Sequence, residues 1–298
     1  MNEPIRLVLG FSAGSASDEI ARIVAPALAS ALSTPVEIEL RPGQNGAAAA
    51  SAVATAAADG RTLFMATLGT HALAPHLQTD LPYDPLHHFA PVALVAAAPL
   101  VLACHPSLGV SGARGLIDLA KREPGKLTYG TSAIGGAPHL AAELFEAMAG
   151  VQLRHVRYSE TTQLYADLET GRIAVSFNNV MSMLPRCTSG RLRALAVTTA
   201  LRSPAAETIP TLAEDALPGY DMSNWLGIVA PRGTAPSRVA WLNEGIARAL
   251  RDPAIRSAML AGGVTPRGGS PDTFAEFMAA ELARWAPVVS RFRDAAHA

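Results

Sequence analysis

The stretch Leu7-Val8-Leu9-Gly10-Phe11-Ser12-Ala13-Gly14-Ser15-Ala16-Ser17-Asp18 decides the fold, because it runs from an apolar strand through a loop of small residues into a helix. The apolar run at 5–9 ends at a glycine, which is typical of a buried parallel strand. After Ser15, apolar side chains recur every three or four residues from Ile20 to Leu28, which is the spacing of one helical face. This order predicts an α/β fold with a loop at the carboxyl end of its first strand.

That loop is a candidate anion site. The first N–H groups of a helix have no intrahelical partner, and the helix dipole adds partial positive charge there. In an open α/β sheet, ligands bind at the carboxyl ends of the strands. Ser15 and Asp18 also spell a variant of the capping box, which is a structural alternative for Asp18. The candidate ligand-binding residues here are Phe11, Ser12, Ala13, Gly14, Ser15, Ser17 and Asp18.

The same loop contains a second pattern, because residues 10–14 match G-x-S-x-G, the nucleophile elbow of α/β-hydrolases. A hydrolase using Ser12 is therefore an alternative. That fold needs an earlier strand and loop for its oxyanion hole, and only nine residues precede Gly10. The helix is also expected to start at Ser15 rather than directly after the serine. We therefore expect no catalytic residue and no enzyme activity.

The composition limits the other classes of function. A chain of 298 residues with 49% hydrophobic and 16% charged residues is expected to form two globular domains. A net charge of -1 gives no footprint for nucleic acid. Cys104 and Cys187 form no metal-ligand motif and are either free thiols or one disulfide; no metal or cofactor is expected. No signal peptide is visible before the first strand, so the protein is either cytoplasmic or exported with its signal already removed.

The strand–loop–helix order is repeated at residues 127–148, where a glycine-rich loop at 130–136 precedes a helix that begins near Pro138. Chain crossings near Ala103 and Ser223 predict one domain of residues 1–103 plus 224–298 and a second of residues 104–223. Further candidate ligand-binding residues at strand ends are Thr70, Thr131, Ser132, Gly135 and Asn178. For the threonines and Ser132, hydrogen bonding within their own loop is the alternative.

The remaining periodic segments give a coarse map. Strands are expected at 36–40, 63–66, 92–95, 100–103, 153–156, 173–177, 192–197 and 225–230, and helices at 47–58, 116–122, 163–168, 236–251, 253–260 and 271–293. Alternating strands and helices predict parallel sheets covered on both faces. His71 and His139 lie near expected helix starts, where histidines are more often structural than ligands.

Several segments resemble one known family. These are Pro4–Phe11, Arg41–Gly43, Gly69–His71, Leu81–Pro85, His139–Phe145 and Gly190–Thr198. They are similar to Bug proteins, the extracytoplasmic solute receptors related to the binding component of tripartite tricarboxylate transporters. The similarity extends in order over almost the whole chain.

The resemblance implies a type II periplasmic-binding-protein fold, in which two α/β domains close on a small carboxylate, namely a di- or tricarboxylate, held in the cleft between them. It implies that the loops at 11–18 and 130–136 hold carboxylates through N–H groups, hydroxyls and bridging waters. It also implies a periplasmic location, a transmembrane permease as partner, and a monomer. A ligand-sensing domain of a regulator shares this bilobal fold, but the sequence shows no DNA-binding segment.

Two departures from the family pattern concern the ligand. The first loop reads Phe11-Ser12-Ala13-Gly14-Ser15 where family members commonly have Phe-Pro-Pro-Gly-Gly. Many members have Phe-Asp-Asn where this chain has Phe177-Asn178-Asn179. Because the missing carboxylate is a natural partner of an amino group, an amino acid is not the expected ligand.

Overall fold

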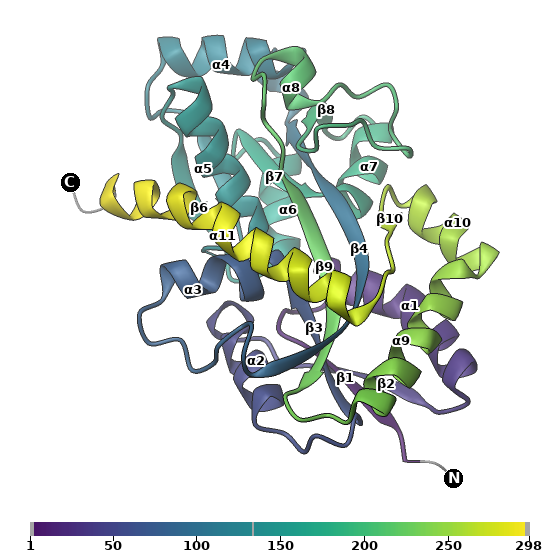
Figure 1. Cartoon of the computed structure of the whole chain (residues 1–298). Coiled ribbons are helices and arrows are strands. Elements are labelled where there is room, and N and C mark those ends of the chain that lie inside the picture. Colours follow the sequence, from purple (N-terminus) through teal and green to yellow (C-terminus); the bar gives the residue numbers. More distant parts are fainter. Residues whose placement is uncertain (1–2, 133, 296–298) are drawn as a thin grey trace. The chain divides into compact units, whose positions relative to one another are not determined.

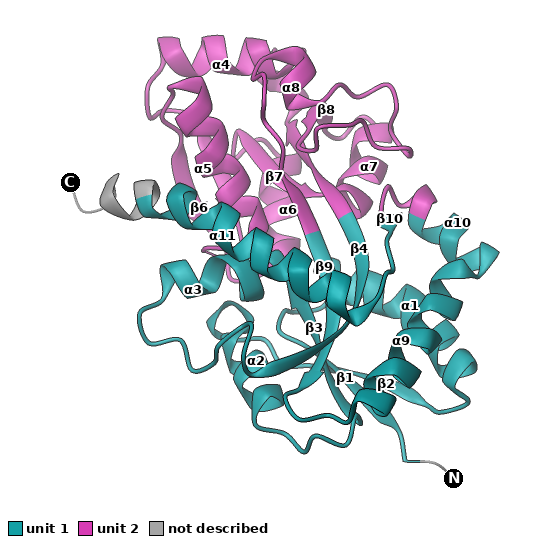
Figure 2. Cartoon of the chain, viewed as in Figure 1, with its two compact units in different colours: residues 1–97, 225–259, 265–298 teal, residues 98–224, 260–264 magenta. Residues whose placement is uncertain are grey.

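The chain forms two compact units in the computed structural model, which describes residues 3–132 and 134–295. Unit 1 comprises Met1–Ala97, Trp225–Met259 and Thr265–Ala298, and unit 2 comprises Ala98–Asn224 and Leu260–Val264 (Figure 2). The first crossing therefore comes earlier than the one expected near Ala103, and the excursion at 260–264 had no counterpart in the sequence pattern. Met1 and Asn2 lie outside the described residues, and so does Ala133 of the glycine-rich loop expected at 130–136.

Unit 1 contains a mixed sheet. Strands β1 (Ile5–Leu9), β2 (Val36–Leu40) and β3 (Thr62–Thr67) are parallel, with β1 in the middle. β9 (Ser223–Pro231) pairs with β3 in the antiparallel direction, and β10 (Thr265–Pro266) pairs with β4 (Phe89–Cys104) at Ala96 and Ala97. Every residue of β3 is buried, as expected of a central strand.

Helices cover this sheet (Figure 1). They are α1 (Ala16–Leu32), α2 (Ala47–Ala54), α3 (Ala74–Leu77), α9 (Pro236–Arg251), α10 (Pro253–Ala261) and α11 (Pro271–Ala295), with single turns η1 (Gln44–Gly46) and η2 (Gly69–Leu73). α1 and α9 approach closely at Gly245, where an added Cβ would lie 2.3 Å from a methyl carbon of Leu32. Ser15 is the N-cap of α1, which confirms the predicted helix start.

A buried carboxylate joins α11 to the sheet of unit 1. Glu281 accepts hydrogen bonds from the indole Nε1 atoms of Trp225 and Trp285, each at 3.1 Å. Arg284 contributes a contact of 3.3 Å to the other oxygen. Glu281 is therefore a buried charged residue of this unit whose two carboxylate oxygens both have partners.

Unit 2 contains a second sheet. β6 (Arg154–Arg157), β5 (Thr128–Thr131) and β7 (Val175–Asn179) are parallel neighbours, and the second half of β4 lies antiparallel between β7 and β8 (Arg193–Val197). The helices are α4 (Ala113–Arg122), α5 (Ala137–Ala149), α6 (Thr161–Glu169), α7 (Val180–Thr188) and α8 (Leu212–Asp215), with a turn η3 (Pro106–Leu108). Parallel strands alternating with helices confirm the predicted α/β class.

The sequence-based map was wrong at one strand and missed the helices α3, α7 and α8. The strands expected at 92–95 and 100–103 form one strand of 16 residues, β4. Pro99 lacks an N–H and interrupts the pattern, but pairing of the two halves with different partner strands keeps the segment extended. Helix α7 was missed, because Pro185 lies inside it.

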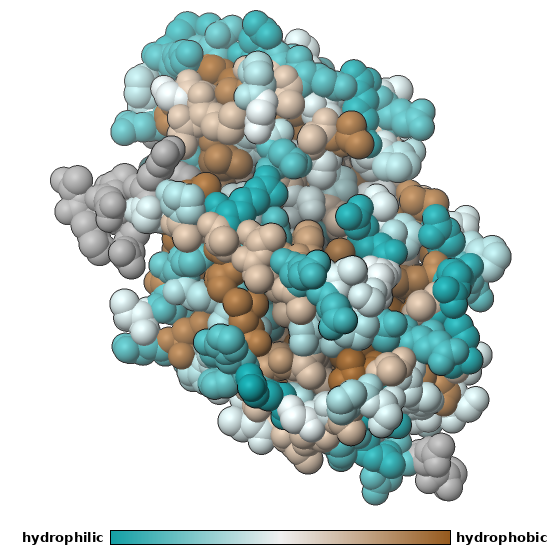
Figure 3. Space-filling view, in the orientation of Figure 1, coloured by the Kyte–Doolittle hydropathy of each residue, from teal (hydrophilic) through white to brown (hydrophobic). Residues whose placement is uncertain are grey.

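The described residues contain neither a membrane-spanning helix nor a cluster of metal-binding side chains. No helix in that part of the chain is both long and apolar enough to cross a bilayer. No group of three or more His, Cys, Asp or Glu side chains in that part is arranged to hold a metal ion. Over the face shown in Figure 3, hydrophobic and hydrophilic residues are interspersed.

Candidate functional site

The loop between β1 and α1 is held by its own side chains. The Ser15 Oγ accepts from the Asp18 N–H at 3.4 Å, and Asp18 Oδ2 accepts from the Gly14 N–H at 2.9 Å. The other Asp18 oxygen lies 2.8 Å from Nε of Arg22. Both carboxylate oxygens thus have partners, and the side chain is buried. Asp18 therefore shapes the loop, as in the capping-box interpretation.

The same loop retains donors for an anion. The first turn of α1 leaves backbone N–H groups without intrahelical acceptors. Ser17 lies in this turn and is buried, with 2% of its surface exposed, and its Oγ is 3.1 Å from the Oγ of half-buried Ser15. One hydroxyl of this pair donates to the other, which leaves the second proton for another acceptor. Ser12, Ala13 and Gly14 are exposed at the tip. The N-terminus of α1 can therefore offer a carboxylate N–H groups, hydroxyls and partial positive charge.

Two glycines bring the neighbouring loops against this one. A Cβ on Gly10 would lie 2.6 Å from the Cα of Gly46, so the two backbones touch. Gly46 has φ +88°, and a Cβ there would lie 2.7 Å from Cγ2 of Thr70 and 3.4 Å from the ring of Phe11. The segments that follow β1, β2 and β3 therefore meet at one edge of the unit 1 sheet, with half-buried Phe11 among them.

Thr70 and His71 support this edge from inside. The Thr70 Oγ1 accepts from the Thr67 N–H at 3.0 Å and lies 3.0 Å from Nδ1 of His71. Thr70 has no exposed surface, so hydrogen bonding within the loop, the alternative considered above, describes its hydroxyl. The His71 ring packs against Phe64 and Phe89, and burial lowers its pKa to about 3. A neutral imidazole is thus enclosed behind the loop.

In unit 2, the loop after β5 leads to the N-terminus of α5. Gly136 is the N-cap residue, and Pro138 lies in the first turn. The Gly135 N–H donates to Nδ1 of His139 at 3.2 Å. This N–H of Gly135, a predicted ligand-binding residue, is therefore bonded to a side chain in the first turn of α5. Other first-turn N–H groups have no intrahelical acceptor.

A cluster of rings lies behind this second loop. Thr131 Oγ1 is 2.6 Å from Nε2 of His155, and that ring lies 4.8 Å from the ring of Tyr129 and 4.7 Å from that of His139. The Tyr129 hydroxyl donates to Glu143 at 2.8 Å. Burial lowers the pKa of both histidines to about 4, so both are neutral near pH 7. Thr131 is fully buried and bonded to this cluster, which makes it a support of the loop.

The remaining polar residues of unit 2 lie at the same sheet edge. β6, β5 and β7 are parallel, so α6, α5 and α7 all begin at their carboxyl ends. Ser132 accepts from the hydroxyl of Thr161, the first residue of α6, at 3.2 Å, which leaves its own proton for another acceptor. The amide oxygen of Asn178 accepts from the Asn179 N–H at 3.2 Å. Three helix N-termini and several polar side chains thus share one edge.

Sequence reasoning selected Asn178 and missed its neighbour. Asn179 is the N-cap residue of α7 but makes no side-chain cap hydrogen bond. Its Oδ1 is buried and has no hydrogen-bond partner among the described residues. A buried amide oxygen without a partner costs about 1–3 kcal/mol, so a ligand or water partner is expected there. The adjacent Asn-Asn pair at a strand end was the signal available in the sequence.

The chemistry of both loops suits binding better than catalysis. Neither loop, at 10–18 or at 130–136, contains a lysine or arginine, so an anion there depends on N–H groups and hydroxyls. Within the described part of the chain, the Ser12 hydroxyl makes no hydrogen bond with a histidine or a carboxylate. α1 also starts at Ala16, four positions after Ser12 rather than directly after it. Among the described residues, Ser12 therefore has no base bonded to its hydroxyl that could activate it.

Comparison with known proteins gives a family match over most of the chain. Residues 20–293 match the model of the tripartite tricarboxylate transporter family receptor. Protein BugT of Bordetella pertussis is 34% identical over 287 residues, which is 96% of this chain and 88% of that protein.

Solved structures are similar over their whole length. An adipate-bound protein of R. palustris is 36% identical with a TM-score of 0.92, and 96% of each chain is covered. MatC from Rhodopseudomonas palustris with bound malate is 29% identical with a TM-score of 0.89, covering 96% of this chain and 98% of that one. The periplasmic binding protein BugD is 26% identical with a TM-score of 0.90, covering 97% of each. These similarities confirm both the predicted fold and the resemblance on which it rested.

Proposed function

Because the chain belongs to the tripartite tricarboxylate transporter receptor family, whose members are solute-binding receptors, we propose that it captures a small di- or tricarboxylate. One observation carries the proposal. Each unit places a helix N-terminus and serine hydroxyls at the carboxyl edge of its own sheet, with α1 and Ser17 in unit 1 and α5 and Ser132 in unit 2. Two anion-binding edges suit a ligand with a carboxylate at each end.

The charge of each edge limits the ligand. A helix N-terminus carries roughly half a positive charge. This charge can stabilise one carboxylate, but it is too small to balance several negative charges close together. The first loop brings no additional cation, and Asp18 is already neutralised by Arg22. A linear acid with well-separated carboxylates therefore fits better than a compact polyanion. The adipate and malate held by the two R. palustris relatives are both dicarboxylates.

The amide side chains at the end of β7 also limit which ligand can bind. Asn178 and Asn179 carry no charge, so an ammonium group on the ligand would meet no carboxylate there. An uncharged amide can instead hydrogen-bond a carboxylate or a hydroxyl. We therefore infer an acid without an amino group.

Capture is proposed to work by hinge closure. The chain passes between the units within strands β4 and β9, and these strands are the proposed hinge. A ligand that contacts both units stabilises the closed form only by the contacts it gains there. The closed receptor would deliver its ligand to a membrane permease, and as in the periplasmic relative BugD, we place the protein in the periplasm.

A thermal-shift screen tests the proposal. The protein is unfolded in denaturant, dialysed and refolded to remove any copurified ligand, and is then heated with mono-, di- and tricarboxylates and with amino acids. A ligand at about 100 times its Kd adds about 2.7 kcal/mol to the free energy of unfolding. A selective shift with one or more dicarboxylates or tricarboxylates is expected. A shift with amino acids alone, or with no compound in the panel, would contradict the proposal.

A further inference from the structure

Unit 2 contains a concave site, of about 480 Å³, whose lining includes neither of the two loops described above. Its walls come from the C-terminal end of α7, the start of β8 and the segment at 205–209, all within this unit. Leu184, Leu192 and Ile209 form an apolar lining, and Thr188 and Thr208 add hydroxyls. The volume lies within the roughly 300–1,000 Å³ of small-molecule sites, and the walls combine apolar and polar groups.

The register of the sheet places this pocket away from the proposed carboxylate site. On β4, Cys104 pairs with Arg193 at the start of β8 and with Val175 at the start of β7. Leu100 of the same strand pairs with Asn179, at the far end of β7. The pocket therefore lies at the amino edge of β7 and β8. α7 connects the two edges, and its nine residues span ~13 Å.

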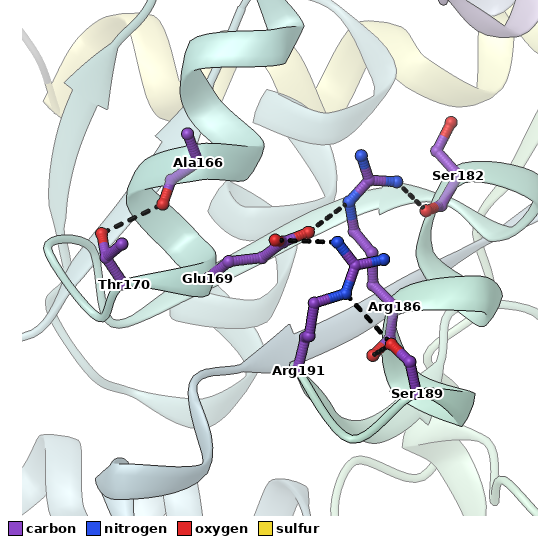
Figure 4. Close-up of polar contacts among 7 residues, drawn as sticks. All are labelled: Ala166, Glu169, Thr170, Ser182, Arg186, Ser189 and Arg191. Atoms are coloured by element: carbon purple, nitrogen blue, oxygen red, sulfur yellow. Dashed lines mark hydrogen bonds and ion pairs between the residues drawn. The ribbon is translucent and has the colours of Figure 1, made fainter.

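One cation in the pocket wall has no anionic partner. Arg193 is exposed and donates to the carbonyl oxygen of Val110 at 2.9 Å. No carboxylate in the described part of the chain lies within ion-pair distance of it. Two nearby arginines differ, because Arg186 and Arg191 both pair with Glu169, at 2.8 and 3.1 Å (Figure 4). Their charge is partly compensated, so the uncompensated charge at the pocket is that of Arg193.

We propose that this pocket binds a small organic monoacid with an apolar body, such as a medium-chain or aromatic acid. The acid group pairs with the guanidinium of Arg193, and the hydrocarbon part lies against Leu184, Leu192 and Ile209. Arg193 supplies the charge, and the apolar walls favour a body that water solvates poorly. The site is distinct from the one that takes a dicarboxylate, so its occupancy does not depend on that function.

Cys187 is a built-in reporter of the pocket. It lines the site and is half-buried, whereas Cys104 has no exposed surface. Burial raises the pKa of both thiols to about 11, so modification by a maleimide is slow enough to follow at pH 8. A ligand in the pocket should slow the modification of Cys187 further.

The experiment uses the full chain and two probes, 1-anilinonaphthalene-8-sulfonate and octanoate. The sulfonate should fluoresce when bound, octanoate should displace it, and octanoate should protect Cys187 from N-ethylmaleimide. Arg193→Gln should weaken octanoate at least about fivefold, because a charge-assisted hydrogen bond is lost. Thr208→Trp, at an exposed rim position, should fill the pocket and abolish displacement and protection.

Arg172→Gln is the matched control, since Arg172 is an exposed arginine of unit 2 that pairs with Asp167 outside the pocket. The Arg172→Gln variant should bind octanoate with the same affinity as the wild type. The inference is overturned if octanoate neither displaces the sulfonate nor protects Cys187 in the wild type. It is equally overturned if Arg193→Gln and Thr208→Trp, with unchanged circular dichroism spectra, bind octanoate as tightly as Arg172→Gln does.

Discussion

Lowering the pH should destabilise unit 1 through one side chain, His71. Its ring has no exposed surface, packs against Phe64 and Phe89, and has a pKa of about 3. Nε2 has no hydrogen-bond partner among the described residues, so an imidazolium there would bring an uncompensated charge into an apolar core. In the unfolded chain, the pKa is the ordinary 6.5. Because the folded pKa is the lower one, stability is complete above pH 6.5 and is lost as the pH falls toward 3.

The expected loss follows from these two values. At pH 5 the unfolded chain is stabilised by protonation of this residue by about 2 kcal/mol relative to pH 7.5, while the folded chain gains almost nothing. Other histidines add to the total. Replacing His71 by glutamine removes its own contribution, so the difference between the variant and the wild type isolates it.

Urea unfolding at pH 7.5 and pH 5, followed by tryptophan fluorescence, measures the difference. All three tryptophans, Trp225, Trp241 and Trp285, lie in unit 1 with His71, so the signal reports that unit. The wild type should lose about 2 kcal/mol more than His71→Gln between the two pH values. His87→Gln, an exposed position in the same unit, should behave as the wild type. Equal losses in His71→Gln and the wild type would refute the reasoning.

Four further outcomes are expected. Ser17→Ala should raise the Kd of the dicarboxylate about fivefold by removing one hydrogen bond of about 1 kcal/mol, as titration calorimetry would measure; an unchanged Kd would remove Ser17 from the site. Glu281→Leu should lower the free energy of unfolding by roughly 2–5 kcal/mol in urea titrations, because two buried indole N–H groups lose their acceptor. Gly46→Ala should cost more than about 1 kcal/mol in the same assay and weaken ligand binding, because of its positive φ and the contact with Thr70. Ring proton shifts of the half-buried His139 and His155 in NMR titrations should show pKa values of about 4, and normal values near 6.5 would contradict the lowering of the pKa by burial.

The sequence was sufficient where a structural signal is local. Ser15 could be recognised as a helix cap because its partner, Asp18, lies three residues away. The loop at the end of β1 could be found because both flanking elements have a clear period. The glycine-rich loop before α5 could be found for the same reason.

It was insufficient where partners far apart in the chain decide the outcome. The extension of β4 through Pro99 depends on pairing with β7 and β10, which no local pattern contains. Thr131 was one of the predicted ligand-binding residues, and no local pattern indicated that its hydroxyl lies 2.6 Å from Nε2 of His155, a residue of the next strand. Asn179 has an unpartnered amide oxygen only because the folded chain buries it.

The most direct test of the account is a calorimetric titration with an acid and its neutral amide. The refolded, ligand-free protein is titrated with the dicarboxylate that gives the largest thermal shift, and then with the diamide of the same length. The account predicts one ligand per chain for the acid and no measurable heat for the diamide, because helix N-termini favour negative charge. Equal binding of the diamide, or no binding of any di- or tricarboxylate, would contradict it.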